Sequence, residues 1–440
     1  MSKKYKAAFI TLGCRVNQYE TRAVKEAFES LGFETGDFSE KCDVYVINTC
    51  TVTAESDRKS MQMIRRARNT GGKEAVVIAM GCMVQINPEK SAKIEEIDLA
   101  VGNKDKISCA QKAMEILKSK KREKTVEVSD ISGKREIDSA KITGSDLTKA
   151  FLKICDGCNN SCAYCIIPKA RGSVCSKTVA EVKSEVETLC ENGYKEVVLT
   201  GIETAAYGKD INSDLVTLVE NVNECGKLER IRLGSLEPTI INEKSVMRLS
   251  ECKKFMPHYH LSLQSGCDAV LNAMRRKYNT KMFLDVVRIL RENIGDVTLT
   301  TDIIVGFPGE TEEMFLETQE FVKKCGFLYV HIFPYSDRAG TLSSKMNNKI
   351  DAQTKRKRAQ RLKKTMLEMR KEVLSNFLGT EREVLVEKTE GKYAFGHTDN
   401  FIETRFENTG KKVKKNDMVK VKLTDFPESA EYVNAEVVKV

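Results

Sequence analysis

The sequence predicts an α/β protein in three parts: an N-terminal doubly wound parallel sheet, a central partial (β/α)6 barrel and a small C-terminal all-β barrel. Short apolar runs alternate with helical patterns over roughly the first quarter of the chain, and the same alternation recurs through residues 150–336. Strand–helix–strand alternation is typical of parallel sheets. Near the C-terminus apolar residues alternate with polar ones, which indicates short antiparallel strands.

The composition is that of a folded protein, with 41% hydrophobic and 31% charged residues in a chain of 440. These values exclude disordered and collagen-like classes, and no apolar run approaches the length of a membrane span. The basic N-terminal tip is followed, after a brief apolar run, by Arg15, Asn17 and Glu20, which does not fit a signal peptide. We therefore expect a cytoplasmic protein.

In the N-terminal part, buried strands are expected at four apolar runs, residues 7–12, 44–49, 75–80 and 98–101. Helical periodicity predicts helices over residues 18–30 and 56–69. Residues 118–149 are rich in Lys, Ser, Asp and Gly and have no lasting periodicity. They are predicted to form a linker with one weak hairpin.

Six strands are expected in the central part, at residues 151–154, 196–200, 230–233, 258–263, 297–305 and 328–333. Helical segments fill the gaps, for example at residues 179–191, 215–224 and 311–324. Six strand–helix units are fewer than a closed eightfold barrel needs, so a partial barrel is predicted. Residues 351–377 then form a helix that carries nine Lys and Arg against three Asp and Glu.

Five short strands, at residues 383–387, 392–395, 401–406, 417–423 and 433–438, predict a small β-barrel. The net charge of the chain is +9, and the helix before this barrel holds most of the surplus. Barrels of this kind bind nucleic acid by aromatic stacking and a cationic groove, which makes RNA contact a hypothesis for Tyr393, Phe395, His397, Phe401 and Arg405. The alternative for the helix is a solvated face with an apolar stripe packed on the central barrel.

Fifteen cysteines, an odd number in a large chain, indicate reduced thiols that bind metal or iron–sulfur rather than disulfides. Cys158, Cys162 and Cys165, the barrel cysteines, form C-x3-C-x2-C directly after the first central strand. Active sites of (β/α) barrels collect at that strand end. The short loop forces the three thiolates around one compact cluster, and three thiolates on a four-iron cluster leave one iron open for substrate.

Two alternatives use a fourth thiolate. Adding Cys155 gives C-x2-C-x3-C-x2-C, which fits either four-thiolate zinc or a closed, ferredoxin-like cluster. Zinc pairs usually stand about fifteen or more residues apart, so this spacing is too tight. Cys155 also continues the strand over residues 151–154, where it fits a small buried apolar residue. An open three-thiolate cluster is the preferred interpretation.

A second set, Cys14, Cys50 and Cys82, the sheet-edge cysteines, ends three predicted strands of the N-terminal part. The carboxyl ends of parallel strands meet at one edge of a sheet, where ligands bind, so these thiolates can meet in space. Three unrelated buried cysteines are the alternative, because cysteine is common in cores. Six more cysteines have no partner spacing and are interpreted as structural: Cys42, Cys109, Cys190, Cys225, Cys252 and Cys325.

Seven ordered motifs resemble the radical S-adenosylmethionine (SAM) methylthiotransferases over essentially the whole chain: TLGCRVNQYE, INTCTV, GCMVQ, CNNSCAYC, LSLQSGCDAVLNAMRRKY, TDIIVGFPGET and FPYSDRAGT. The terminal barrel resembles a TRAM domain. Within the family the chain is most similar to the MtaB-type enzymes, whose substrate is N6-threonylcarbamoyladenosine in tRNA. The resemblance implies a methylthiotransferase domain (3–117), a linker (118–143), a radical SAM core with the basic helix (144–375) and a TRAM domain (376–440).

The resemblance also implies two 4Fe-4S clusters, one on the barrel cysteines and one on the sheet-edge cysteines, each with an open iron. The first would bind SAM and reduce it to a 5′-deoxyadenosyl radical, which takes hydrogen from carbon 2 of the adenine at position 37. The second would carry the sulfur to be inserted, and a second SAM would supply the methyl group. Catalytic side chains are not identified, because the cofactors carry the organic chemistry.

SAM contacts are expected from an aromatic residue beside the last barrel cysteine and from residues at or near strand ends: Tyr164, Thr200, Gly201, Glu237, Gln264 and Asp302. The expected partners are tRNA, an electron donor such as flavodoxin or ferredoxin, and a sulfur source, with the protein itself a monomer. The enzymatic alternatives are methylthiolation of N6-isopentenyladenosine in tRNA or of a ribosomal-protein aspartate. The non-enzymatic alternative is an RNA-binding iron–sulfur protein.

Overall fold

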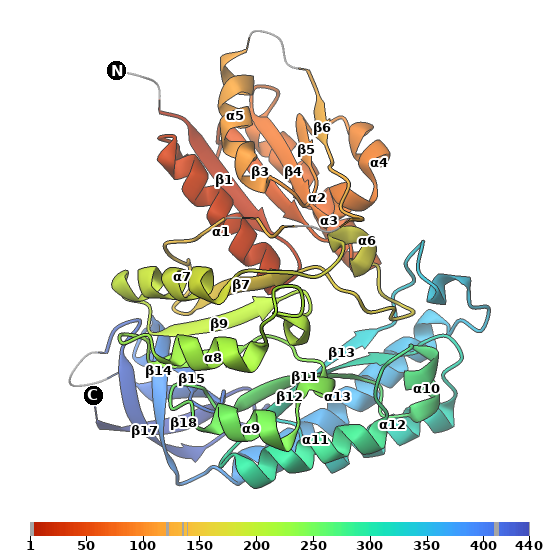
Figure 1. Cartoon of the computed structure of the whole chain (residues 1–440), viewed down its shortest axis with the longest axis vertical. Helices are drawn as coiled ribbons and strands as arrows, with labels where there is room; N and C mark the ends of the chain where they lie inside the picture. The colour runs from red at the N-terminus through yellow and green to blue at the C-terminus, as the bar shows by residue number, and fades with distance from the viewer. Residues whose placement is uncertain (1–3, 120–122, 134–135, 139, 409–412, 440) are drawn as a thin grey trace.

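The computed structural model describes residues 4–119, 123–133, 136–138, 140–408 and 413–439. The N-terminal sheet lies at the top of Figure 1, the central barrel lies below it, and the C-terminal barrel packs against one side of the central barrel. This arrangement confirms the predicted α/β fold class. No described helix is both long enough and apolar enough to cross a membrane.

The N-terminal part is a six-stranded, fully parallel sheet in the order β2-β1-β3-β4-β5-β6. Its strands are β1 (Lys6–Thr11), β2 (Glu34–Thr35), β3 (Val44–Thr49), β4 (Val76–Gly81), β5 (Leu99–Val101) and β6 (Thr125–Glu127). Its helices are α1 (Arg15–Ser30), α2 (Ala54–Gly71), α3 (Cys82–Ile86), α4 (Pro88–Ala92) and α5 (Cys109–Lys118).

Both faces of this sheet are buried, which explains why its strands are continuous apolar runs. Successive residues of β3 point to opposite faces: Val44 and Val46 pack with α1 and α5, whereas Tyr45 and Ile47 pack with α2 and α3. The expected linker differs from the structure at one point. Thr125–Glu127 does not form a hairpin but pairs in parallel with β5, because the sheet edge offers unpaired backbone groups to any extended segment that passes it.

The central part has two hydrogen-bonded strand groups, β10-β9-β7-β8 and β11-β12-β13, which two isolated bridges join. The six expected strands are β7 (Ala150–Asp156), β9 (Glu196–Gly201), β10 (Arg230–Leu233), β11 (His258–Gln264), β12 (Thr298–Val305) and β13 (Tyr329–Pro334). A short antiparallel strand, β8 (Cys175–Ser176), is added at the edge beside β7. The helices are α6 (Ile167–Arg171), α7 (Val179–Glu191), α8 (Leu215–Asn223), α9 (Glu243–Ser250), α10 (Asp268–Ala273), α11 (Thr280–Asn293) and α12 (Glu312–Cys325).

The C-terminal part is a closed barrel in the order β14-β15-β16-β18-β17, as the alternating pattern predicts. Its strands are β14 (Glu381–Glu390), β15 (Tyr393–Thr398), β16 (Glu403–Glu407), β17 (Met418–Asp425) and β18 (Val433–Lys439). The basic helix α13 (Ala352–Ser375) connects it to the central barrel. Leu362, Met366 and Met369 of α13 join the core of the central barrel, and Leu374 joins the core of the C-terminal barrel. The apolar stripe is therefore a structural feature of this helix.

The C-terminal barrel docks on the central one through buried polar contacts. Arg232 donates to the Thr398 carbonyl at 2.7 Å and to the Asp399 carbonyl at 2.9 Å. Phe401 stacks on His258 with ring centroids 4.2 Å apart and on His397 at 4.6 Å. The hypothesis of RNA contact is wrong for the Phe401 ring, which stacks on His258 in the interface between the two barrels, whereas the half-buried His397 ring stacks on Phe401 of its own barrel.

Candidate active site

The barrel cysteines lie on the loop after β7, at the mouth of the central barrel. Gly157 begins this loop with a φ of +76°, and a Cβ there would lie 2.0 Å from the Ser173 carbonyl oxygen, so only glycine fits. The Cys158 N–H donates to the Gly172 carbonyl at 3.0 Å, and the Cys165 N–H donates to the Cys162 carbonyl at 3.1 Å. These bonds fold the loop back on itself.

Each barrel cysteine sulfur accepts one hydrogen bond. The donors are the Asn160 N–H to Cys158 at 3.4 Å, the Ile167 N–H to Cys165 at 3.4 Å, and the Arg276 guanidinium to Cys162 at 3.0 Å. Such donors stabilise negative charge on sulfur, as hydrogen bonds to iron–sulfur ligands do. The arrangement provides three convergent thiol ligands with their second layer of contacts already formed.

Burial acts in the opposite direction and raises the pKa of Cys158 to about 11 and that of Cys165 to about 12. Without a metal these thiols hold their protons at neutral pH, and a bound metal displaces them. Cys155 is fully buried, and its thiol donates to the Glu203 carbonyl at 3.5 Å, which occupies it in a protein contact. The donor set therefore fits a cluster with three protein thiolates.

Two carboxylates lie beside the barrel cysteines. The Asn160 amide donates to Glu203 at 3.0 Å and to Glu237 at 3.3 Å, and Arg276 pairs with Glu237 at 3.2 Å. Burial, together with the charge of Glu237, raises the pKa of Glu203 to about 6. Paired acceptors and a guanidinium next to the open side of a cluster are suited to an ammonium and a carboxylate, the two charged ends of an amino acid.

The structure brings Tyr164 and Glu237 to this point, as the sequence predicts, and Tyr164 lies within electrostatic range of Arg276 and of two barrel cysteines. Thr200 is buried at the end of β9. The requirement for glycine at Gly201 comes from packing, because a Cβ there would lie 2.3 Å from the Cys155 sulfur. Gln264 ends β11 at a register shift, with a φ of +71°.

Asp302 belongs to a separate polar cluster on three adjacent strands. It lies 3.2 Å from the His260 ring nitrogen, and one polar atom each from His260, Asp302 and His331 lies within 4.8 Å of the others. His260 also shares a hydrogen bond of 2.9 Å with Thr300. We call His260, Asp302 and His331 the polar wall. No sequence motif indicated this cluster, because its members are 29 to 71 positions apart along the chain.

Each sheet-edge cysteine comes directly after a parallel strand: Cys14 caps α1 shortly after β1, Cys50 follows β3, and Cys82 begins α3 after β4. Cys82 lies within electrostatic range of both Cys14 and Cys50, so the three thiols meet at one edge of the sheet. The alternative of three unrelated core cysteines does not predict this convergence. Cys50 and Cys82 are buried, and Cys14 is exposed.

The surroundings of the sheet-edge cysteines also fit a metal cluster. A Cβ at Gly13 would lie 2.8 Å from the Cys50 sulfur, so the backbone leaves room beside that atom only because glycine is there. The Asn103 amide donates to the Cys82 sulfur at 3.5 Å and to the Ala170 carbonyl at 2.6 Å. Its own oxygen is buried without a hydrogen-bond partner among the described residues. Three thiols around such a pocket are ligands for iron–sulfur or zinc.

The two sets of cysteines lie on either side of α6. This helix begins two residues after Cys165, and its Ala170 accepts the hydrogen bond from Asn103 that reaches Cys82. Four residues of the site were not predicted from the sequence, Glu203, Asn160, Arg276 and Asn103, although Asn160 and Arg276 belong to motifs that carry the family resemblance. Arg276 and Asn103 reach the cysteines through contacts that are distant in sequence, and Asn160 connects the cysteine loop to Glu203 and Glu237.

Comparison with protein families defines the class. Residues 152–322 match the Radical SAM superfamily, and residues 6–102 match the uncharacterized protein family UPF0004. The chain is 39% identical to a threonylcarbamoyladenosine tRNA methylthiotransferase MtaB from Bacillus subtilis, over 94% of this chain and 93% of that protein. It is 40% identical to the protein of the same name from Aquifex aeolicus, over 87% and 92%. The chain therefore belongs to the radical SAM methylthiotransferase family.

A second group of relatives carries another name. The chain is 34% identical to a tRNA-2-methylthio-N(6)-dimethylallyladenosine synthase from Acetivibrio thermocellus, over 88% of this chain and 82% of that protein. Among solved structures, the radical S-adenosylmethionine methyltransferase TsrM from Kitasatospora setae superposes with a TM-score of 0.55 at 15% identity, over 76% and 72% of the two chains. That likeness concerns the fold alone.

Proposed function

We propose that this protein is a tRNA methylthiotransferase that adds a methylthio group to carbon 2 of N6-threonylcarbamoyladenosine at position 37. The observation that carries the proposal is the convergence of two cysteine trios beside one helix, in a chain that is similar over most of its length to enzymes named for this reaction. A non-catalytic iron–sulfur protein would need neither the second trio nor the carboxylate pair at the first.

Each of the three parts of the fold has its own role in the proposed reaction. Residues 3–117 hold the auxiliary 4Fe-4S cluster on the sheet-edge cysteines, and residues 144–375 hold the radical SAM cluster on the barrel cysteines. Residues 118–143 connect them, and residues 376–440 form a TRAM domain that contacts tRNA. Tyr393, Phe395 and Arg405 are half-buried on that barrel, with the Arg405 guanidinium 4.6 Å from the centre of the Tyr393 ring, and we assign the contact with RNA to this surface.

When bound, the two clusters and SAM supply the electron, the 5′-deoxyadenosyl radical and the sulfur that the reaction requires. The chain orients these groups. Glu203 and Glu237 would hold the SAM ammonium, Arg276 would hold its carboxylate, and Tyr164 would hold its adenine. Arg276 also keeps its hydrogen bond to Cys162, so SAM binding and cluster geometry depend on the same side chain.

The remaining predicted contacts are assigned to the barrel mouth. Thr200, Gly201 and Gln264 border the SAM site at strand ends, and Asp302 of the polar wall contacts His260 at 3.2 Å and would help to position the cofactor or the substrate base. An anticodon loop is a suitable substrate, since an enzyme that acts on a base must take it out of its stack, which costs less in a loop than in a duplex. The protein works as a cytoplasmic monomer, with flavodoxin or ferredoxin as electron donor and a separate sulfur source.

The experiment is mass spectrometry of tRNA nucleosides from a bacterial strain that lacks this gene. We expect 2-methylthio-N6-threonylcarbamoyladenosine to disappear and its unthiolated precursor to accumulate. Wild-type protein should restore it, as should the matched control Cys252→Ala, which removes a buried cysteine far from both trios in sequence. The barrel-cysteine triple alanine variant should not restore it. Loss of the isopentenyladenosine derivative instead would replace the proposed substrate by the alternative that some relatives' names carry.

A further inference from the structure

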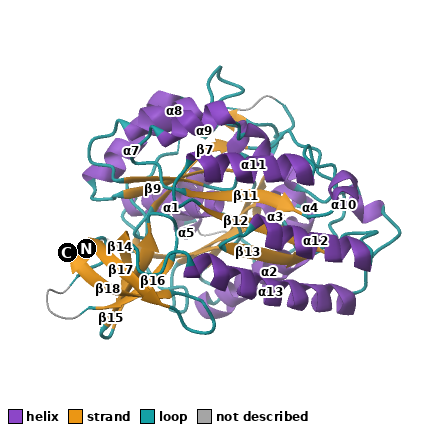
Figure 2. Cartoon of the chain, turned by 90° about the horizontal axis from the view of Figure 1, so that it is seen from below, coloured by secondary structure: helices purple, strands orange, loops and turns teal. Residues whose placement is uncertain are grey.

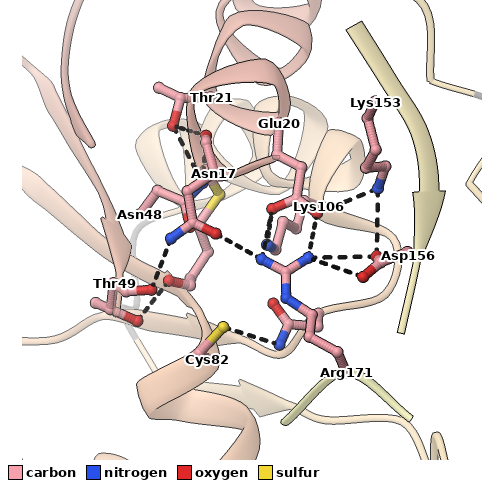
Figure 3. A network of polar contacts seen from close by, with 12 residues as sticks. Asn17, Glu20, Thr21, Asn48, Thr49, Cys82, Lys106, Lys153, Asp156 and Arg171 are labelled. Carbon is pink, nitrogen blue, oxygen red and sulfur yellow. Dashed lines mark hydrogen bonds and ion pairs between the residues drawn. The ribbon is translucent and has the colours of Figure 1, made fainter. Parts of the chain in front are cut away.

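A buried ion network joins the N-terminal sheet to the central barrel between the two sets of cysteines (Figure 3). The network consists of Glu20 on α1, Lys106 just before α5, Lys153 and Asp156 on β7, and Arg171 at the end of α6. All five side chains are at most 5% exposed. They come from both sides of the interface, so the network forms only in the folded chain.

Arg171 is the centre of the network. Its Nη1 donates to Glu20 Oε1 at 2.5 Å and lies 3.3 Å from Asp156 Oδ2, and its Nη2 donates to Asn17 Oδ1 at 2.5 Å. Lys153 contacts the same two carboxylates at 3.2 and 3.4 Å, and Lys106 pairs with Glu20. Figure 3 shows the guanidinium between these carboxylates and Asn17, with Cys82 on the neighbouring segment.

Among the described residues of this network the fully buried charges do not balance, because three cations face two carboxylates. Burying a net charge is costly unless a partner of opposite sign is close. Asp138 lies at the rim, where it is partly exposed in the wall of a cavity that Glu20 and Lys153 also line. Solvent in that cavity screens its charge, so its carboxylate compensates the buried cations less than Glu20 and Asp156 do.

The sheet-edge cysteines lie where the missing negative charge is needed. The Arg171 guanidinium is within electrostatic range of Cys14, Cys50 and Cys82. Asn17 connects them, because its side-chain oxygen accepts hydrogen bonds both from Arg171 and, at 3.8 Å, from the Cys14 thiol. A four-iron cluster held by three thiolates carries net negative charge, since the thiolates outweigh its doubly positive core.

We propose that Arg171 is a positioning residue that supplies the counter-charge of the auxiliary cluster and thereby raises its reduction potential. A buried cation stabilises the more negative, reduced state of a nearby cluster. The same contact couples cluster loading to the interface between the N-terminal sheet and the central barrel. This inference rests on the proposed assignment of the sheet-edge cysteines as cluster ligands.

The test uses the full-length chain with the barrel cysteines changed to alanine, so that only the auxiliary cluster is present. Redox titration followed by electron paramagnetic resonance gives its midpoint potential. In this background Arg171→Met should reduce the ratio of reduced to oxidised cluster at least tenfold at the original midpoint, a shift of 59 mV or more to lower potential. Arg171→Lys keeps the charge, so its midpoint potential should stay close to that of the parent protein.

Lys153→Met is the matched control. It removes the same charge from the same network, but Lys153 contacts the carboxylates on the side of β7. The shift in midpoint potential should therefore be less than half of that in Arg171→Met. Cluster loading should also raise the melting temperature less in Arg171→Met than in the parent, because the network of that variant is already balanced without a cluster. If Arg171→Met does not fold, Lys106→Met removes another cation within electrostatic range of Cys82 and must shift the potential in the same direction.

The possible outcomes separate the inference from the proposed function. A parent protein that binds no iron would overturn the assignment of the sheet-edge cysteines. A loaded protein whose potential is the same with Arg, Lys or Met at position 171 would overturn the role of Arg171 alone. Equal shifts in Arg171→Met and Lys153→Met would also contradict it, because the effect would then follow from the total charge and not from the position of the guanidinium.

Discussion

The basic helix α13 provides the most quantitative prediction about RNA binding. Arg356, Lys357, Lys363 and Lys364, the cationic face, lie on one side of α13 and are exposed, and none forms an ion pair with a described residue. The apolar residues of the helix pack on the two barrels. The perturbation is to change all four residues of the cationic face to glutamine, which preserves helix propensity.

The magnitude follows from counterion release. Each phosphate contact contributes about 0.7 to 0.9 to the slope of log affinity against log salt concentration, so four contacts contribute about 3. Between about 50 and 200 mM salt, wild-type protein should therefore lose about 60-fold more affinity for tRNA than the variant, which corresponds to about 2.5 kcal/mol. The affinity for unrelated tRNAs should weaken similarly, because phosphate contacts position RNA without reading its sequence.

The assay is filter binding of tRNA at a series of salt concentrations. The matched control changes Lys227, Lys244, Lys253 and Lys281 to glutamine, which removes the same charge from exposed positions near α8, α9 and α11. These helices lie on the opposite side of the central barrel from α13 in Figure 2. Equal salt slopes for wild type and the cationic-face variant, in a variant with unchanged melting temperature, would refute RNA contact by α13.

Three further predictions concern the clusters and the barrel interface. Reconstituted protein should hold about eight irons, and changing either cysteine trio to alanine should leave about four. Only the barrel-cysteine variant should lose SAM cleavage, which is measured as the formation of 5′-deoxyadenosine. A sheet-edge variant that keeps all its iron would disprove the second cluster. Cys155→Ser should keep both clusters and most turnover, whereas a gain in SAM cleavage would show that Cys155 is a fourth ligand. Although burial alone would raise the pKa of Glu387, hydrogen bonds and charges from His397 and Lys149 lower it to about 2. The lowered pKa stabilises the folded state above the ordinary carboxyl pKa, and this stabilisation is lost as the pH falls towards 2. Glu387→Gln should therefore lower the free energy of unfolding, measured in urea, by up to about 3 kcal/mol at pH 7 and by progressively less below pH 5. A loss that does not depend on pH would contradict this prediction.

Local sequence patterns were sufficient for the elements and the cysteine trios. Strands such as β3 and β4 lie on their apolar runs, because a strand buried on both faces is mostly apolar. The barrel cysteines are close in sequence, so their convergence is fixed by chain length alone. The sheet-edge cysteines could be grouped because parallel topology brings strand ends together.

Only the tertiary structure decided the surroundings of those cysteines. Arg276 and Cys162 are 114 positions apart, and Arg171 and Glu20 are 151 apart, so no periodicity or spacing relates them. Phe401, between β15 and β16, shows the same limit, because an aromatic residue of the barrel looks alike in sequence whether it faces RNA or, as here, stacks on His258. The sequence by itself predicted the candidate ligands and the strands after which they lie. The tertiary structure determined which charges surround the ligands, because electrostatic neighbours depend on distance in space and not on order along the chain.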